Sequence, residues 1–332
     1  MADTITERAC RLAALPVFAG CRAADLYPLA AVLHPLRATS GETLMHQGQR
    51  ADFFLIIEAG EARVHHEDPD GDTTDIEVPV GSVIGEIALL RHTARVATVT
   101  ATAELSGFVG DGVAFDVMIE LPGVLEKLLN TARQRLAAFL TPVRIRLHDG
   151  TELFLRPVLP GDNARAVSGR VEFSDETLFR RFMTTRDPTG ALMEYLFEVD
   201  YIDHFVWVVL DAQDGNLIAD ARFVRDEIDR HIAEIAFIVG DDYQGRGVGS
   251  FLMKALAVAA RVAGVEKFTA RVLSDNLPMR TILDRFGASW EREDVGVVTT
   301  VIEVPDLNSI HLPEELIDQI ADVARQAMRS MS

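Results

Sequence analysis

The sequence predicts two domains of different fold class, an all-β barrel with flanking helices followed by an α+β domain built around a mixed sheet. Three observations support this prediction. A chain of 332 residues is too long for one average core. Glycines recur about every ten residues between Gly41 and Gly81, with short β-rich runs such as 53–57 between them. Beyond residue 145, strand and helix patterns alternate instead.

The first domain is predicted over residues 1–140, and 141–150 is predicted as a linker, since Thr141-Pro142 stops the preceding helix. Helices flank the β-rich run at both ends. The predicted helices are 6–15, 23–33, 113–120 and 124–140, and the last two predicted strands of the barrel are 95–100 and 104–109.

The second domain is predicted over residues 151–304, and 305–332 is predicted to hold a separate amphipathic helix at 313–331. The predicted strands are 153–156, 205–210, 216–224, 232–239, 267–272 and 295–304, and the predicted helices are 247–263 and 277–286. This alternation is typical of an α+β fold.

The composition argues against nucleic acid as a partner. The chain carries 51 acidic and 32 basic residues, a net charge of −19, whereas clustered Lys and Arg hold phosphate backbones. A lysine-bearing protein surface is the partner that such a chain attracts. No apolar run reaches the roughly 20 residues that span a bilayer, no signal-peptide pattern is visible, and Cys10 and Cys21 form no disulfide framework. We expect a cytoplasmic protein without membrane contact and, from the scattered histidines, without a metal.

One stretch of the first domain has the residues of an anion-binding pocket. Gly85-Glu86 opens a short predicted helix, whose first N–H groups, such as those of Ile87 and Ala88, can bind a phosphate. Arg95 can add a charged fork to the same anion. A carboxylate does not bind a phosphate, so we expect Glu86 to bind a hydroxyl, such as that of a ribose.

This stretch resembles the phosphate-binding cassette of cyclic-nucleotide-binding domains, and the similarity extends over residues 10–140. The resemblance implies that Glu86 holds the ribose and Arg95 the cyclic phosphate. Val96 stands where cGMP-selective relatives tend to carry a threonine, which favours cAMP. The alternative is a degenerate cassette that binds nothing. In such domains the last helix folds over the base, and the candidates to cap it are Arg133, Gln134 and Arg135, of which we choose Arg135.

A glycine-rich loop, Gln244-Gly245-Arg246-Gly247-Val248-Gly249, lies between a predicted strand and a long predicted helix. Its glycines let the backbone approach a ligand closely, and the N–H groups up to Ser250 can bind a pyrophosphate. The loop is not a P-loop, because no Lys-Ser/Thr pair follows it. A glycine loop alone does not identify the ligand.

The loop spacing resembles the Gln/Arg-x-x-Gly-x-Gly/Ala motif of the GCN5-related N-acetyltransferases (GNAT), and 234–239, 274–279 and 285–288 resemble that family's neighbouring elements. The resemblance implies acetyl-CoA as cosubstrate and an amine as acceptor. The alternative for Arg285 is that it lies exposed on a helix and binds no ligand. The implied cofactor-binding residues are Phe237, Ile238, Val239, Gln244, Gly245, Arg246, Gly247, Val248, Gly249, Ser250, Asn276 and Arg285.

Attack of an amine on a thioester requires a base, because an ammonium group has no lone pair. Glu234 is the one carboxylate on the strand that would line the acetyl group, and its apolar neighbours favour a partly buried base. The alternative is a surface glutamate at the strand's edge. A backbone N–H near Ile238 or Val239 is expected to hold the oxyanion. Leu283 stands where many relatives carry a tyrosine acid, so water is the expected proton donor.

Together the two domains resemble the cAMP-regulated protein lysine acetyltransferases of mycobacteria and related actinobacteria. That resemblance implies lysine side chains as acceptors, with acyl-CoA synthetases and universal stress proteins as substrates. A cAMP-gated acetyltransferase for small amines and a non-catalytic sensor of cAMP and acetyl-CoA remain alternatives. The helix at 313–331 is a candidate autoinhibitory lid over the acceptor groove, or else packs ordinarily on the catalytic domain.

Overall fold

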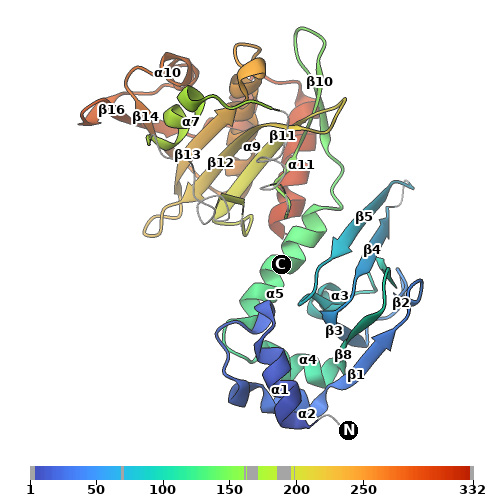
Figure 1. Ribbon diagram of the computed structural model, residues 1–332. Helices are drawn as coiled ribbons and strands as arrows, with labels where there is room; N and C mark the ends of the chain where they lie inside the picture. The colour runs from blue at the N-terminus through green and yellow to red at the C-terminus, as the bar shows by residue number, and fades with distance from the viewer. Residues whose placement is uncertain are drawn as a thin grey trace. The chain divides into compact units, whose positions relative to one another are not determined.

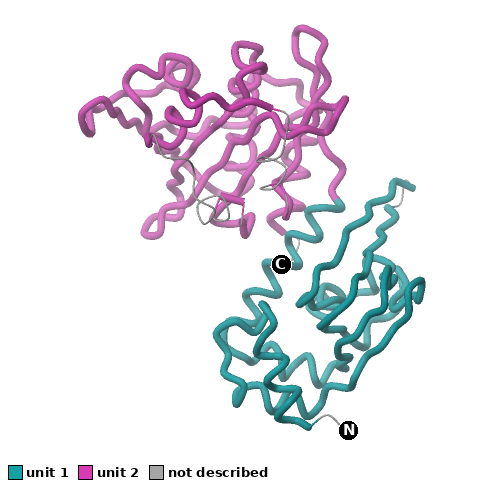
Figure 2. Tube along the Cα trace, viewed as in Figure 1, with its two compact units in different colours: residues 1–139, 331 teal, residues 140–330, 332 magenta. Residues whose placement is uncertain are grey.

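The protein folds into two compact units, whose boundary in the chain falls between Phe139 and Leu140 (Figures 1 and 2). The computed structural model describes residues 4–68, 71–160, 162, 171–184, 196–197 and 199–329. The last residues of the predicted C-terminal segment, 330–332, therefore lie outside the described part.

The first unit contains two four-stranded antiparallel sheets with the strand orders β1-β8-β3-β6 and β2-β7-β4-β5. Helices precede and follow the strands, as the sequence predicted. The strands are β1 (His34–Ala38), β2 (Thr43–Met45), β3 (Phe53–Ala59), β4 (Ala62–Glu67), β5 (Thr73–Val78), β6 (Val83–Ile84), β7 (Thr98–Ala101) and β8 (Leu105–Asp111). The α-helices are α1 (Ile5–Ala13), α2 (Tyr27–Val32), α3 (Glu86–Arg91), α4 (Gly112–Ile119) and α5 (Val124–Ala137).

Strand β3 shows how this unit buries two cores. Successive side chains of a strand point to opposite faces, and in β3 Leu55 and Ile57 pack into the core between the sheets. Phe54 and Ile56 pack on the other side, in a cluster with residues of the flanking helices such as Leu12. The unbroken apolar run at 53–57 therefore serves both faces of one strand.

The second unit is an eight-stranded mixed sheet with the order β15-β16-β14-β13-β12-β11-β10-β9. Only the β13–β14 pair is parallel among the pairs described. The strands are β9 (Val143–Arg146), β10 (Glu152–Pro157), β11 (His204–Asp211), β12 (Leu217–Arg225), β13 (Ile232–Val239), β14 (Lys267–Leu273), β15 (Glu291–Asp294) and β16 (Val297–Glu303). The helices are α7 (Asp175–Phe182), α9 (Val248–Ala263), α10 (Leu277–Asp284) and α11 (Glu314–Arg329).

One sequence prediction for this unit is wrong, and another is incomplete. The supposed linker 141–150 contains β9, which pairs with β10 and buries Val143 and Ile145 on one face. Its alternation is only four residues long and adjoins a helix end, so it does not stand out as a pattern. The predicted strand 295–304 is found as β16, but the preceding strand β15, with which it forms a hairpin through a turn at Gly296 (φ 75°), was not predicted.

The C-terminal helix α11 packs on α9 and on strands β9 and β10 of the same unit. Its apolar stripe, which includes Ile317, Ile320 and Ala324, is buried in this contact. The amphipathic pattern thus predicted the helix and its buried face correctly.

Helix α7 and a buried polar group on the sheet were not predicted. Asp220 and Arg222 of β12 form an ion pair of 2.8 Å, and both are almost fully buried. The β11–β12 register puts His204 on the same face as Arg222. Burial, and secondarily Arg222, lower the pKa of His204 to about 4. This histidine is therefore neutral in the folded protein at neutral pH.

We expect the free energy of unfolding to fall as the pH drops from about 6.5 toward 4. In this window the unfolded chain binds a proton on His204 that the folded chain excludes, which costs about 2 kcal/mol between pH 7.5 and pH 5. Urea unfolding at the two pH values, compared between the wild type and His204→Gln, measures this loss. The exposed His231→Gln variant is the control, and an equal loss in His204→Gln would contradict the assignment to His204.

Candidate functional site

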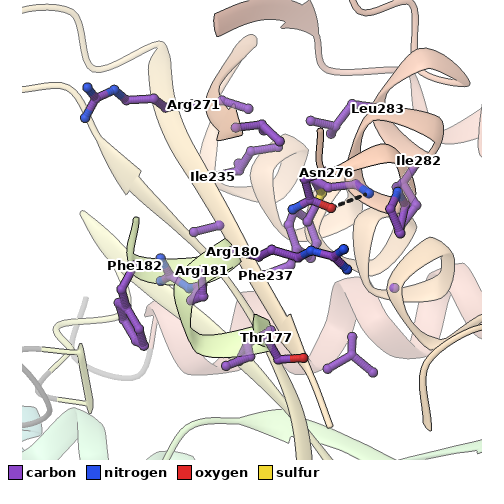
Figure 3. A pocket seen from close by; sticks show the side chains of 18 of the residues that line it. Thr177, Arg180, Arg181, Phe182, Ile235, Phe237, Arg271, Asn276, Ile282 and Leu283 are labelled. Carbon is purple, nitrogen blue, oxygen red and sulfur yellow. Dashed lines mark hydrogen bonds between the residues drawn. The ribbon is translucent and has the colours of Figure 1, made fainter. Parts of the chain in front are cut away.

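A cavity of the second unit lies where two parallel strands separate. The register between β13 and β14 ends at the pair Glu234–Thr269, so the rest of β13 has no partner on that side. A cavity of about 440 Å³ opens there, lined by residues 234–239 of β13 and 270–272 of β14 (Figure 3). Helices α7 and α10 supply further walls. Backbone groups of β13 that would pair with β14 are thus open to a ligand.

Glu234 lines this cavity at the end where the two strands begin to part. The expectation of a partly buried base is wrong, since Glu234 is exposed. Its immediate neighbours Ala233 and Ile235 are buried, because alternate residues of β13 face opposite sides of the sheet. The apolar neighbours in sequence therefore do not surround the carboxylate. The alternative hypothesis, that Glu234 is a surface glutamate, agrees with its exposure but does not account for its position in the cavity lining.

The glycine loop leads into the uncapped start of α9. Gly245 and Gly247 have φ values of 71° and 93°, a conformation that glycine adopts without strain. Gly247 is the residue before α9 and offers no side-chain cap, so the first N–H groups of this 16-residue helix have no side-chain acceptor at that position. Gly245 and Gly249 line the cavity. This end of the cavity suits an anion.

Two polar residues of the loop bind other parts of the protein. Gln244 Nε2 donates to Val239 O at 3.1 Å and to Thr177 Oγ1 at 2.9 Å, so its side chain fixes the loop. Arg246 Nε donates to Asp149 Oδ2 at 2.8 Å. Hydrogen bonds from Thr151, followed by the contact with Arg246, lower the pKa of Asp149 to about 2. These two side chains position the loop, and its backbone remains the ligand-binding part.

The two later cofactor candidates differ in placement. Asn276 is buried, lines the cavity, and caps α10 by accepting a hydrogen bond from Met279 N at 3.2 Å (Figure 3). Arg285 is exposed and lies outside the cavity lining, with Nη1 3.5 Å from Ser250 Oγ at the start of α9. Leu283, at the position of the missing tyrosine, is buried and lines the cavity.

Among the lining residues that sequence reasoning missed are four of α7, namely Thr177, Arg180, Arg181 and Phe182. Of the predicted cofactor residues, Phe237, Ile238, Val239, Gln244, Gly245, Gly249 and Asn276 line the cavity, while Arg246, Gly247, Val248, Ser250 and Arg285 do not. None of the described lining residues belongs to α11, which packs on α9, β9 and β10 instead. In this structure α11 therefore has the ordinary packing that was the alternative, and the lid prediction stays untested.

The anion-binding stretch of the first unit forms a second, small cavity. All seven predicted residues line it, namely Gly85, Glu86, Ile87, Ala88, Arg95, Val96 and Arg135. Glu86 and Arg95 are buried, although both are charged. Arg95 donates to Gly85 O at 3.0 Å and to Phe53 O at 2.5 Å. Burial lowers the pKa of Arg95, and the nearby Asp52 and Glu86 partly oppose this effect.

Helix α5 and the residues after it fill much of this cavity. Arg135 forms a 2.6 Å ion pair with Glu86, and Phe139 lines the cavity while stacking on His66 with ring centroids 4.2 Å apart. The remaining cavity volume is about 40 Å³, which is too small for a nucleotide. A nucleotide therefore has to displace these side chains. Arg135 binds Glu86 here, and the prediction that it caps the base stays untested.

We expect Arg135→Ala to bind cAMP about tenfold more tightly than the wild type. The ion pair between Arg135 and Glu86 competes with a ribose hydroxyl for the carboxylate, and the substitution removes this competitor. Isothermal titration with cAMP measures the effect, with Arg133→Ala on the same helix as the control. Weaker binding by Arg135→Ala would show that the arginine holds the nucleotide instead.

Two other kinds of site are absent from the described ranges. No helix there is long and apolar enough to cross a membrane. Nor do those residues contain a cluster of three or more His, Cys, Asp or Glu side chains that could hold a metal ion.

Comparison with known families supports the class that the fold and cavities define. Residues 35–120 match the cyclic nucleotide-binding domain, and residues 152–289 match the acetyltransferase (GNAT) domain. The protein is therefore an N-acetyltransferase joined to a cyclic-nucleotide-binding domain.

Full-length relatives have the same arrangement. The chain is 53% identical over all 332 residues to Acetyltransferase Pat of Mycolicibacterium smegmatis, and it covers that protein completely. It belongs to the family of this cyclic-nucleotide-binding acetyltransferase. The solved cAMP-binding acyltransferase from Mycobacterium smegmatis has a TM-score of 0.53 at 49% identity, with both chains fully covered. Its E234A mutant has a TM-score of 0.54 at 50% identity, covering 99% of each chain.

Proposed function

We propose that the protein transfers the acetyl group of acetyl-CoA to the ε-amine of lysine residues in other proteins, under the control of cAMP. The observation that carries this proposal is the position of Glu234 at the end of the cavity where β13 and β14 part. The opposite end holds the glycine loop and the start of α9. A cosubstrate phosphate at the loop and an acceptor amine at Glu234 would occupy the two ends of one cavity.

The residues of this cavity divide the reaction between them. The N–H groups at the start of α9 bind the pyrophosphate of acetyl-CoA, and the unpaired edge of β13 over residues 235–239 binds its extended arm. Asn276 lies beside this edge, in the cavity wall. A backbone N–H near Ile238 or Val239 is the candidate to hold the oxyanion.

Glu234 acts as the general base in this proposal. It removes one proton from the lysine ammonium, whose nitrogen then attacks the thioester carbonyl. A carbon–nitrogen bond forms, the carbon–sulfur bond breaks, coenzyme A leaves as a thiolate, and the nitrogen loses its second proton to water to give the neutral amide. Because Leu283 offers no proton, water supplies one to the thiolate. The exposure of Glu234 allows a proton to pass to solvent after each turnover.

The first unit supplies the regulatory site in this proposal. Arg95 and the N–H groups of Ile87 and Ala88 bind the cyclic phosphate, and Glu86 binds the ribose 2′-hydroxyl after Arg135 has moved away. Val96 offers no hydroxyl to a guanine amino group, which favours cAMP over cGMP. Acyl-CoA synthetases and universal stress proteins are the proposed acceptors, in the cytoplasm.

Mass spectrometry of the products tests the acceptor class. The enzyme is incubated with acetyl-CoA and cAMP and either a lysine peptide, a purified acyl-CoA synthetase, or spermidine and an aminoglycoside. The proposal predicts an added acetyl group on lysine of the peptide and the synthetase. Acetylation of the small amines alone would replace it with a small-molecule acetyltransferase, and no transfer to any of them would favour a sensor.

A further inference from the structure

Three arginines line the proposed acetyl-transfer cavity (Figure 3), and they differ in their partners. Arg180 forms an ion pair with Glu176 of the same helix. Arg271 of β14 donates to Glu293 Oε2 at 2.7 Å. Arg181 forms neither a hydrogen bond nor an ion pair with any described residue, and its guanidinium lies 5.1 Å from the ring of its neighbour Phe182. Arg181 is thus the one of the three whose charge is not matched.

Neither of the two described carboxylates that act on Arg181 forms an ion pair with it. Asp220 accepts from Arg222 at 2.8 Å, and Arg222 is further fixed by donating to Leu196 O at 2.6 Å. Glu234 lies opposite Val224 in the sheet register, on the same face as Asp220 and Arg222. Both carboxylates act on Arg181 only from beyond ion-pair distance.

Arg181 remains a cation under all ordinary conditions. Burial, and secondarily Arg222, lower the pKa of its guanidinium to about 10. Its side chain is half-buried in the last turn of α7. A half-buried charge without a partner is costly in a folded protein, and such groups are common where a ligand supplies the missing charge. The missing group would be an anion located beside Glu234.

We propose that Arg181 binds a carboxylate of the reacting substrate at the Glu234 end of the cavity. This inference rests on the proposed function, because Glu234 marks the end where the acceptor and the acyl group meet. The planar guanidinium suits a carboxylate, which it can bind through two parallel hydrogen bonds. The carboxylate has two possible sources. It belongs either to an acidic residue next to the acceptor lysine or to the far end of a dicarboxylic acyl group.

Steady-state kinetics with matched substrate pairs test the inference and separate the two sources. The first pair consists of lysine peptides with Glu or Gln beside the lysine, both with acetyl-CoA. The second pair consists of succinyl-CoA and the uncharged butyryl-CoA, both with the Gln peptide. We expect kcat/KM to be about tenfold higher for the carboxylate member of one pair.

Variants assign this preference to Arg181. Arg181→Gln should abolish the preference, so that the ratio of the two kcat/KM values falls to about one. Arg181→Lys should retain part of the preference, because lysine keeps the positive charge but lacks the planar guanidinium. Arg271→Gln is the matched control, because it removes a cavity-lining guanidinium that is already paired, and it should keep the wild-type ratio. The affinity for acetyl-CoA and the melting temperature of each variant report on its fold.

Each outcome decides the matter. Equal kcat/KM within both pairs, or a preference that persists in Arg181→Gln, would overturn the inference, and transfer to the lysine peptides would still support the proposed function. If no lysine peptide is acetylated at all, the proposed function fails and the inference fails with it.

Discussion

Glu234→Gln is expected to lower kcat for acetyl transfer by about 100- to 1,000-fold at neutral pH, the usual contribution of a general base. Glutamine has nearly the same shape but cannot accept the proton of the lysine ammonium. Because Glu234 is exposed, its replacement should leave the fold intact. Its position at the far end of the cavity from the glycine loop predicts an unchanged affinity for acetyl-CoA.

The pH dependence of this variant provides a sharper test. Without the base, only acceptor lysine that has already lost its proton can react, so the residual rate should rise with pH toward the lysine pKa of about 10.4. Glu291→Gln, a substitution of an exposed carboxylate on edge strand β15, is the control and should keep the wild-type profile. A full rate in Glu234→Gln at neutral pH would show that another group removes the proton.

Arg95→Lys is expected to weaken cAMP binding by roughly 100-fold, which corresponds to about 3 kcal/mol. Lysine keeps the positive charge but cannot bind the phosphate through a planar fork while also donating to Gly85 O and Phe53 O. These two carbonyls fix the guanidinium in the cavity before any ligand arrives, so the loss combines weaker contact with poorer positioning.

Titration of a fluorescent cAMP analogue measures this effect. Arg50→Lys, at an exposed position that bridges to Ala94, is the matched control and should bind normally. Chemical unfolding of the purified variant shows whether weaker cAMP binding reflects a changed binding site or a destabilised fold. Wild-type affinity in Arg95→Lys would contradict the assignment of the phosphate to this residue.

The sequence predicted well those elements whose pattern is local and long. Strand β13 was predicted with the bounds that the structure has, and α9 to within one residue, because an apolar run bounded by turn residues and a long apolar helix are strong signals. The glycine loop was placed correctly between them. The same holds for the cassette, whose seven candidate residues line one cavity.

The missed features depend on contacts between distant parts of the chain. Helix α7 has a serine cap at Ser174 and acidic residues in its first turn, but it is only eight residues long and buries no side chain completely, so the pattern is short. The ion pair of Arg135 with Glu86 joins residues 49 apart, and the bond of Arg246 to Asp149 joins residues 97 apart. No local pattern predicts which side chains meet in the fold.

The central claim is that cAMP bound at Arg95 controls acetyl transfer at Glu234. Its most direct test is the rate of acetylation of a lysine peptide at saturating acetyl-CoA, titrated with cAMP in the wild type and in Arg95→Lys. The account predicts a rate that changes with cAMP and saturates at the Kd found by direct binding, and a midpoint shifted roughly 100-fold by Arg95→Lys. A transfer rate that is the same at every cAMP concentration would contradict it.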